Sequence, residues 1–304
     1  MATVLVTRHL PEGALAPLAA HDVRVRAGDS PYSHAELVQA VGDVDGIVCV
    51  LSDRIDADVI AAAPRLRAVG NVAVGLDNVD TVAARAAGVQ LINTPGVLDE
   101  TTADLAFALI LAASRGLSEA ERDLRAGSWR GWSLLDHLGR DVHGATLGLV
   151  GYGRIAHAVA RRAAGFSMTV LHWSHRDTGE PGYVKDLDDL LVRSDIVSVH
   201  VPLTDSTRHL IGARELALLG PDSVIVNTAR GAVLDEAALA AALERGEIFA
   251  AGIDVYSDEP RVSPELLRAP RTVLLPHIGS ASLATRRRMA LMATSGVAAA
   301  LAGS

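Results

Sequence analysis

Short apolar runs alternate with helical patterns along most of the chain. In the first part, strands are predicted at Thr3 to Val6, Gly46 to Val50, Ala68 to Asn71 and Val89 to Ile92, with helices between them. Regular alternation of strand and helix indicates a parallel sheet that is covered on both faces.

This pattern is interrupted at residues 93–96, Asn-Thr-Pro-Gly, and a long helical run begins near Thr101, so a domain junction is expected there. A second series follows, with strands predicted at Thr146 to Val150, Met168 to His172, Ile196 to Val201, Val224 to Asn227, Ala250 to Val255 and Val273 to Leu275. The last stretch, Ser280 to Leu301, is rich in alanine and helical. The predicted fold class is α/β, with two doubly wound parallel-sheet domains.

Composition narrows the functional classes. The 304 residues suffice for two domains, and 49% hydrophobic with 21% charged residues is typical of a soluble globular protein. A net charge of −8 argues against nucleic-acid binding, and the basic run 286–288 is most simply a solvated helix face.

No apolar stretch is long enough to span a membrane, and the N-terminus does not have the pattern of a signal peptide. The single Cys49 excludes a disulfide framework and a cysteine-based metal site, so we expect a cytoplasmic protein with no metal.

A glycine-rich turn follows the strand predicted at Thr146 to Val150. Gly151, Gly153 and Ala156 match the Gly-x-Gly-x-x-Gly/Ala fingerprint of dinucleotide-binding folds, in the required context between a strand and a helix. Gly151 would make the tight turn, Gly153 would let a pyrophosphate approach the backbone, and Ala156 would allow close packing of helix and strand. The helix N-terminus would supply N–H groups to the phosphates.

The end of the next strand bears on the choice of cofactor. NAD-binding folds usually carry a carboxylate there, which binds the ribose 2′-hydroxyl, but this chain has Ser174, His175 and Arg176. A serine and an arginine suit a 2′-phosphate, so the sequence favours NADP over NAD. The alternative is that Arg176 is solvated and that Asp177 binds the ribose.

Three polar residues follow three successive strands of the second series. Arg230, Glu259 and His277 should therefore lie at the carboxyl edge of one sheet, near the glycine-rich turn. Hydride transfer to a 2-oxo acid needs a proton donor, for which His277 is suited, and Glu259 could fix its tautomer and favour its charged form. Arg230 could hold the substrate carboxylate and polarise the carbonyl. Taken singly, Glu259 could equally be a solvated residue of a turn. His277 could equally be a histidine at a strand end whose hydrogen bonds are all made within the protein.

The chain resembles the D-isomer-specific 2-hydroxyacid dehydrogenases over nearly its whole length. The resemblance is carried by blocks at residues 71–80, 148–155, 200–203 with Thr207, 227–231, 254–260 and 276–280. It implies Arg230, Glu259 and His277 as the catalytic set. It also implies a Rossmann cofactor domain at 95–280, inserted into a flavodoxin-like substrate domain at 1–94 plus 281–304.

The same resemblance implies roles for further residues. Backbone N–H groups of Val74 and Gly75 would bind the substrate carboxylate, and Asp254 would meet the nicotinamide carboxamide. Besides the glycine turn and the residues at 174–176, the cofactor would be lined by Thr102, Arg154, Ile155, Val201, Pro202, Thr207, Thr228, Ala229 and Gly279.

Residues 51–56 and 128–132 look most like those of the glyoxylate/hydroxypyruvate reductase branch. This likeness implies a homodimer, a substrate contact at Ser52, and a tryptophan that reaches the partner's active site. Trp132 is the first candidate and Trp129 the second, with packing at the dimer interface or in the core as the alternative. Val74 stands where phosphite-oxidising relatives carry lysine, and no arginine of the phosphoglycerate-oxidising type stands near Asn71.

The predicted reaction is the reduction of a small 2-oxo acid, such as glyoxylate or hydroxypyruvate, to the D-2-hydroxy acid. Two other classes stay open at this point. The chain could be a non-catalytic, NAD(H)-sensing paralogue of the corepressor type, although the presence of both His277 and Glu259 argues against this. It could also be a catalytically idle structural paralogue.

Overall fold

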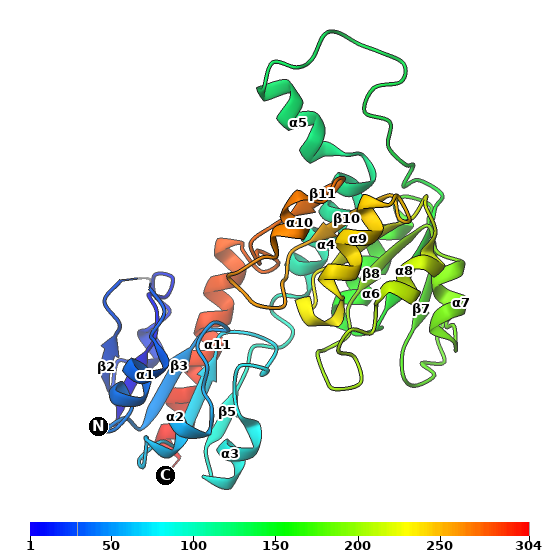
Figure 1. Cartoon of the computed structure of the whole chain (residues 1–304). Coiled ribbons are helices and arrows are strands. Elements are labelled where there is room, and N and C mark those ends of the chain that lie inside the picture. The colour runs from blue at the N-terminus through cyan, green and yellow to red at the C-terminus, as the bar shows by residue number, and fades with distance from the viewer. Residues whose placement is uncertain (29, 304) are drawn as a thin grey trace. The chain divides into compact units, whose positions relative to one another are not determined.

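The structure is a computed structural model that describes residues 1–28 and 30–303. Asp29 and Ser304, which fall in the ranges expected for the first domain, lie outside the described residues. The chain divides into two compact units. Figure 1 shows the chain coloured by residue number from the N-terminus (blue) to the C-terminus (red). Unit 1 comprises Met1–Leu98 and Ser280–Ser304, and unit 2 comprises Asp99–Gly279. In the described part of the chain, no helix has the length and apolar character needed to cross a membrane.

Unit 1 contains a five-stranded parallel sheet with the order β2-β1-β3-β4-β5. This order is that of the flavodoxin-like folds, as predicted. The strands are β1 (Thr3–Val6), β2 (Asp22–Val25), β3 (Gly46–Cys49), β4 (Ala68–Asn71) and β5 (Gln90–Ile92).

Helices cover both faces of this sheet because its side chains alternate between the two sides. Leu5 of β1 lies in a core with Leu37, Val59 and Ala84, which come from α1 (His34–Ala40), α2 (Ala57–Ala61) and α3 (Thr81–Ala86). Its neighbour Val4 lies in a second core with residues of the short η1 (Ala16–Leu18) and of α11 (Leu283–Ala302). The C-terminal helix thus completes the unit that the N-terminal strands begin.

Strand β2 was not predicted. Among the described residues, its four residues, Asp-Val-Arg-Val, pair with β1 alone. Asp22 and Arg24 are exposed, while the two valines are half-buried. An edge strand of this kind has no continuous apolar run, so its sequence gives a weak signal.

Unit 2 contains a six-stranded parallel sheet with the order β11-β10-β9-β8-β6-β7. Its strands are β6 (Thr146–Val150), β7 (Thr169–Trp173), β8 (Ile196–Val199), β9 (Val224–Asn227), β10 (Ala250–Ile253) and β11 (Thr272–Leu274). Beyond β7, a single parallel bridge joins His172 to Tyr183, at the place where a Rossmann sheet has one more strand. The short segment between Arg176 and Tyr183 explains why no full strand forms there.

Both faces of this second sheet are also buried. On one face lie α4 (Asp99–Ser114) and α6 (Arg154–Ala164), whose Phe107 and Val159 share a core with strand residues. The other core holds leucines of α7 (Leu187–Val192), α8 (Ala213–Leu219), α9 (Glu236–Glu244) and α10 (Pro264–Arg268). Burial of this apolar surface is the main driving force that holds the layers together.

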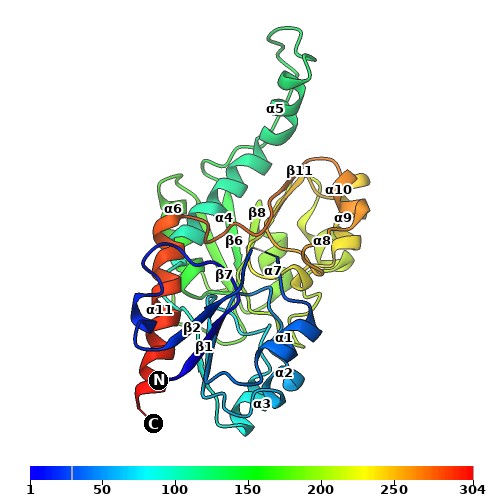
Figure 2. The same ribbon diagram turned by 90° about the vertical axis from the view of Figure 1, so that its left-hand side faces the viewer.

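One segment of unit 2 does not join these layers. Helix α5 (Leu117–Arg125) has no buried residue, and Figures 1 and 2 show it and the loop after it extending away from the sheet of unit 2. We call residues 117–141 the arm.

Candidate active site

The predicted dinucleotide turn lies between β6 and α6. Gly151 has a φ of 94°, and a Cβ atom there would lie 2.8 Å from backbone atoms of His200 and Val201, so no larger residue fits. By contrast, a Cβ atom on Gly153 would meet nothing within 4 Å. Gly153 is the N-cap residue of α6 and provides no side-chain hydrogen bond, and Ala156 is fully buried. Open space beside the uncapped N–H groups of Arg154 and Ile155 fits a pyrophosphate.

The loop after β7 carries the residues predicted to meet the adenosine ribose. His175 and Arg176 are exposed, whereas the hydroxyl of Ser174 donates to the carbonyl oxygen of Arg176. The carboxylate of Asp177 accepts the N–H of Gly179 at 2.8 Å and so closes a turn within the loop.

Further predicted cofactor residues surround the end of β10. The carboxylate of Asp254 is buried and accepts the N–H groups of Ile278 and Gly279 at 2.7 and 2.8 Å. Burial raises the pKa of Asp254, while the hydrogen bond from Ile278 opposes that rise. A Cβ atom on Gly279 would lie 3.4 Å from the Thr102 side chain, so both residues lie beside Asp254.

Two other predicted cofactor segments follow β8 and β9. In the first, which contains Val201 and Pro202, the hydroxyl of Thr207 donates to the Pro202 carbonyl at 2.6 Å, so it serves the turn itself. In the second, the buried hydroxyl of Thr228 has no hydrogen-bond partner within residues 1–28 and 30–303, and Ala229 is half-buried. An orphaned buried hydroxyl at this edge of the sheet is consistent with a polar ligand.

Arg230 stands in a tight turn after β9. The buried Asn227 closes this turn, since its side chain donates to the Arg230 carbonyl at 2.9 Å and accepts the Ala229 N–H at 3.0 Å. A Cβ atom on the next residue, Gly231, would lie 1.9 Å from the carbonyl carbon of Tyr256. The arginine turn therefore lies directly against the backbone of the loop that carries Glu259.

The structure brings His277 and Glu259 together. Nδ1 of His277 lies 2.8 Å from Oε2 of Glu259, and both side chains are about one-quarter exposed, at 25% and 27%. Glu259 also accepts the N–H of Tyr256 at 3.0 Å. His277 has a φ of 54°, which is uncommon for a residue with a side chain, and its N–H bonds to the Asp254 carbonyl at 2.8 Å. Asp254 thus holds the strained turn that presents the imidazole.

These contacts set the protonation of the pair. Burial by itself would raise the pKa of Glu259, but hydrogen bonds from His277 and Tyr256, together with the charge of Arg230, lower it below its usual value. An ionised carboxylate only accepts hydrogen bonds, so Nδ1 of His277 must carry a hydrogen. The other ring nitrogen, Nε2, is then the one that can exchange a proton with a ligand.

Val74 and Gly75, predicted to bind the substrate carboxylate, lie in unit 1 in the loop after β4. Their carbonyl oxygens accept Asn93 and Asn71 side chains at 2.7 and 2.9 Å. Their N–H groups make no hydrogen bond in the described part of the chain, so both are available to an anion.

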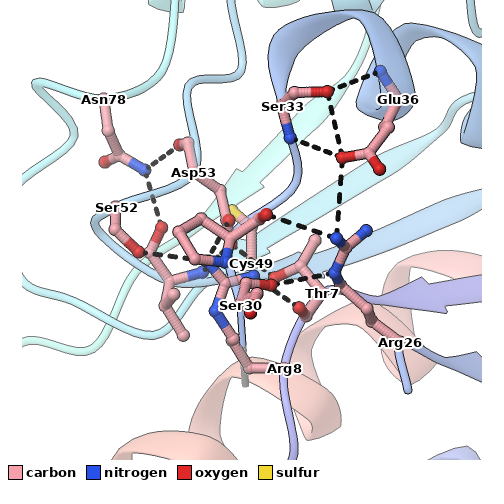
Figure 3. A network of polar contacts seen from close by, with 12 residues as sticks. Thr7, Arg8, Arg26, Ser30, Ser33, Glu36, Cys49, Ser52, Asp53 and Asn78 are labelled. Atoms are coloured by element: carbon pink, nitrogen blue, oxygen red, sulfur yellow. Dashed lines mark hydrogen bonds and ion pairs between the residues drawn. The ribbon is translucent and has the colours of Figure 1, made fainter. Parts of the chain in front are cut away.

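Ser52 also belongs to unit 1 and follows β3. Figure 3 shows it in a network of polar contacts with Arg8, Asp53 and Asn78. The network lies at the carboxyl ends of neighbouring strands, where ligands of open α/β sheets bind. Arg8 was not singled out from the sequence.

Trp132 lies on the arm of unit 2 and is 83% exposed. Trp129 is exposed as well, so neither ring is in the core of this chain. The arm also exposes Leu117, Leu124, Leu134, Leu135 and Leu138, each to more than half of its surface. A cluster of exposed apolar side chains of this kind is typical of a protein–protein interface.

Asn227, Gly231 and Tyr256 support the predicted site, although no role was inferred for them from the sequence. Tyr256 is buried, its hydroxyl donates to the Leu275 carbonyl at 3.0 Å, and burial raises its pKa to about 12. Only the position of Asn227 and Gly231 on either side of Arg230 hinted at their part in the turn.

Comparison with known proteins identifies the family and agrees with the predicted fold. Residues 107–279 match the family model of the D-isomer specific 2-hydroxyacid dehydrogenase NAD binding domain. Over 299 residues the chain is 46% identical to a glyoxylate reductase of Korarchaeum cryptofilum, covering 95% of this chain and 90% of that protein. A solved Thermus thermophilus protein is 42% identical, with a TM-score of 0.93 and coverage of 99% and 97% of the two chains.

A second solved structure is that of the NADPH-dependent glyoxylate/hydroxypyruvate reductase of Sinorhizobium meliloti in complex with NADP and malonate. It is 35% identical, with a TM-score of 0.86 over 96% of this chain and 91% of that chain. Since the family model spans more than half of the residues and a close relative nearly all of them, the chain belongs to the D-isomer specific 2-hydroxyacid dehydrogenase family, a family of nicotinamide-dependent oxidoreductases.

Proposed function

We propose that this enzyme reduces glyoxylate, hydroxypyruvate or a similar small 2-oxo acid to the D-2-hydroxy acid, with NADPH as the preferred cofactor. The observation that carries the proposal is the contact of 2.8 Å between His277 and Glu259, held by Asp254 beside the arginine turn. A relative named glyoxylate reductase, with 46% identity over 95% of this chain, supports the substrate class.

In this reaction a bound reduced nicotinamide supplies the hydride. As the hydride reaches the carbonyl carbon, the carbonyl oxygen gains negative charge, Nε2 of His277 donates a proton to it, and the 2-oxo group becomes a 2-hydroxyl group. Glu259 keeps the hydrogen on Nδ1 and stabilises the imidazolium that precedes this transfer. Arg230 binds the substrate and polarises its carbonyl with its planar guanidinium.

The substrate carboxylate is held by the N–H groups of Val74 and Gly75, which have no hydrogen-bond partner among the described residues. Ser52 and Trp132 make further substrate contacts. We assign these tasks to a substrate domain at residues 1–94 plus 281–304, except Trp132, which comes from the inserted cofactor domain at 95–280. In a homodimer, Trp132 on the exposed arm would serve the partner subunit.

The preference for NADPH rests on the loop after β7. No carboxylate stands at the strand end, where it would repel a 2′-phosphate, and Asp177 already binds the N–H of Gly179. Exposed Arg176 is then the cation for the phosphate, with Ser174 and His175 beside it. The remaining cofactor contacts are those predicted from the sequence, including the hydroxyl of Thr228 and the side chain of Asp254. We expect the enzyme to act in the cytoplasm, since its one cysteine is free and buried.

The direct test mixes purified protein with NADPH and glyoxylate and follows nicotinamide absorbance. We expect turnover that His277→Ala lowers by about 100-fold or more, the usual contribution of a positioned acid. Binding of NADPH, followed by its fluorescence, should persist in this variant. Unchanged turnover would contradict the role of His277, and cofactor binding without turnover of any 2-oxo acid by the wild type would indicate a sensing paralogue instead.

A further inference from the structure

The sheet of unit 1 has a topological switch point between β1 and β3. In an open sheet of this order, ligands bind outside the carboxyl ends of the two strands on either side of that point. Arg8 follows β1, and Ser52 and Asp53 follow β3, so all three stand at this edge. The sheet order therefore draws attention to Arg8, which the proposed function leaves without a role.

The guanidinium of Arg8 contacts Asp53 and the backbone of Thr7. It lies 2.9 Å from the carboxylate of Asp53, and the two side chains are 11% and 0% exposed. It also donates to the Thr7 carbonyl at 2.6 Å. Asp53 in turn accepts the Thr7 hydroxyl and, at 3.0 Å, the N–H of Val50. The contact between Arg8 and Oδ1 of Asp53 is an ion pair without hydrogen-bond geometry, so the orientation of the guanidinium is set by this pairing and by the Thr7 carbonyl. Removal of either partner would leave the other charge buried and unpaired.

The same guanidinium donates to the hydroxyl of Ser52 at 3.3 Å. Ser52 is exposed, and its hydroxyl has no other partner among the described residues. Because the oxygen accepts from Arg8, its own hydrogen is directed away from the arginine and is available to a ligand. A charged donor also polarises the hydroxyl, which makes it a better donor in turn.

The same network ties Ser52 to the proposed carboxylate-binding groups. The side chain of Asn78 donates to the carbonyl oxygens of Val50 and Asp53 at 3.2 and 2.9 Å. It is joined to Asn71, which donates to the Gly75 carbonyl at 2.9 Å. Figure 3 shows the part of this network around Ser52, Asp53 and Asn78. Through Asn78 and Asn71, the loop with Ser52 is hydrogen-bonded to the loop with Gly75.

We propose that Arg8 is a positioning residue for substrate selection: it orients the Ser52 hydroxyl as a donor to a polar group on the third carbon of a 2-oxo acid. The enzyme then prefers a 3-hydroxy-2-oxo acid, such as hydroxypyruvate, to the same acid without that hydroxyl, pyruvate. This inference rests on the proposed function, because it assumes that a 2-oxo acid binds at this edge.

The test compares kcat/KM for hydroxypyruvate and pyruvate with NADPH in the wild type, Ser52→Ala, Arg8→Lys and the double variant. We expect the preference for hydroxypyruvate to fall about tenfold in each single variant, the effect of one lost hydrogen bond. Lysine keeps a charge beside Asp53 but loses the fork that reaches Ser52. The double variant should lose no more than a single one, because both changes act through the same Ser52 hydroxyl. Ser52→Thr, which keeps the hydroxyl, should keep the preference.

A merely structural role would lower kcat/KM for both acids equally and leave their ratio unchanged, which would overturn the inference. Arg26→Lys is the matched control, because Arg26 also donates to a loop carbonyl in unit 1, that of Ser30 at 2.8 Å. A ratio that changes as much in this variant as in Arg8→Lys would also overturn it. The two failures are distinguishable. An unchanged ratio in the variants of an active enzyme contradicts only the role of Arg8, whereas a wild type that reduces no 2-oxo acid contradicts the proposed function itself.

Discussion

At the scale of single residues, the candidate site depends on a few backbone positions with no freedom to change. His277 keeps its φ of 54° because the three N–H groups of His277, Ile278 and Gly279 all bond to Asp254. Strain of this kind persists only where the surroundings impose it, and it is common at active sites. Gly231 is constrained even more tightly, by the backbone of Tyr256.

Gly231→Ala tests that constraint. The new methyl group would lie 1.9 Å from a backbone carbon, so the Arg230 turn or the Tyr256 loop must move and the Arg230–Glu259–His277 set is displaced. We expect kcat/KM to fall at least about 100-fold, as misplacement by about 1 Å does, with a lower melting temperature. Gly165→Ala is the control, since a Cβ atom there meets the Arg162 carbonyl at 3.4 Å, an ordinary contact. Wild-type turnover in Gly231→Ala would contradict the packing described here.

Arg176 is the residue on which the cofactor preference depends. Arg176→Ala should weaken binding of NADPH about tenfold while NADH binding stays nearly constant, because only NADPH carries the 2′-phosphate. The measurement is a fluorescence titration of each dinucleotide. The control is Arg193→Ala, which changes an exposed arginine directly after α7. Equal effects on both dinucleotides would remove the phosphate-binding role.

At the scale of elements, the loop after β7 is fastened to the glycine turn by aromatic and imidazole rings. Tyr152, between the two glycines, stacks on His172 with ring centroids 3.6 Å apart and lies 4.1 Å from His157. His172 bonds to Thr178 at 2.8 Å, and His157 lies 3.1 Å from Glu180. The loop with Arg176 therefore depends on contacts made by β7 and α6.

The contact between His157 and Glu180 should respond to pH. The pKa of His157 is raised, mainly by its hydrogen bond to the Gly153 carbonyl and further by Glu180. Partial burial and the charge of Arg161 act in the opposite direction but are outweighed. A raised pKa means that the contribution to stability is complete below the ordinary histidine pKa and is lost as the pH rises through the folded-state value. His172, whose pKa is lowered by burial, and Asp177 also face this cluster.

We expect amide hydrogen exchange at residues 178–182 to accelerate, beyond its intrinsic pH dependence, between about pH 6 and pH 9 in the wild type. Glu180→Gln should exchange quickly already at about pH 6, because the carboxylate partner is gone. His34→Gln, which removes a similar exposed contact with Asp56 in unit 1, is the control. Exchange that is the same in wild type and Glu180→Gln throughout this range would contradict the coupling.

At the scale of the whole molecule, the arm is the segment of unit 2 whose apolar side chains are not buried in the core of that unit. Leu134, Leu135 and Trp132 are 72%, 75% and 83% exposed, and the preceding helix α5 has no buried residue. Exposed apolar surface in such a segment favours association, and a homodimer would bury it.

Sedimentation should show a dimer for the wild type and a monomer for Leu135→Glu, because a charge buried at the interface is strongly unfavourable. Val82→Glu is the matched control, an exposed apolar residue on α3 outside the arm. A wild-type monomer at micromolar concentration, or a Leu135→Glu dimer, would contradict the role of the arm.

The sequence by itself determined the features that depend on local patterns. Two doubly wound sheets followed from the alternation of strand and helix, and the predicted strand ends lie no more than two residues from the observed ones. The glycine turn could be predicted because its three small residues are close in sequence. The meeting of Arg230, Glu259 and His277 at one edge was inferred because parallel strands share a direction.

Tertiary structure decided what depends on strand order and side-chain orientation. The edge strand β2 has too few apolar residues to be predicted from the sequence. The Arg8–Asp53 pair forms because β1 and β3 are neighbours in the sheet. Likewise, the close approach of Gly231 to Tyr256 and the stack of Tyr152 on His172 join segments that are distant in the chain. Such contacts form when whole elements pack, so no local pattern of residues encodes them.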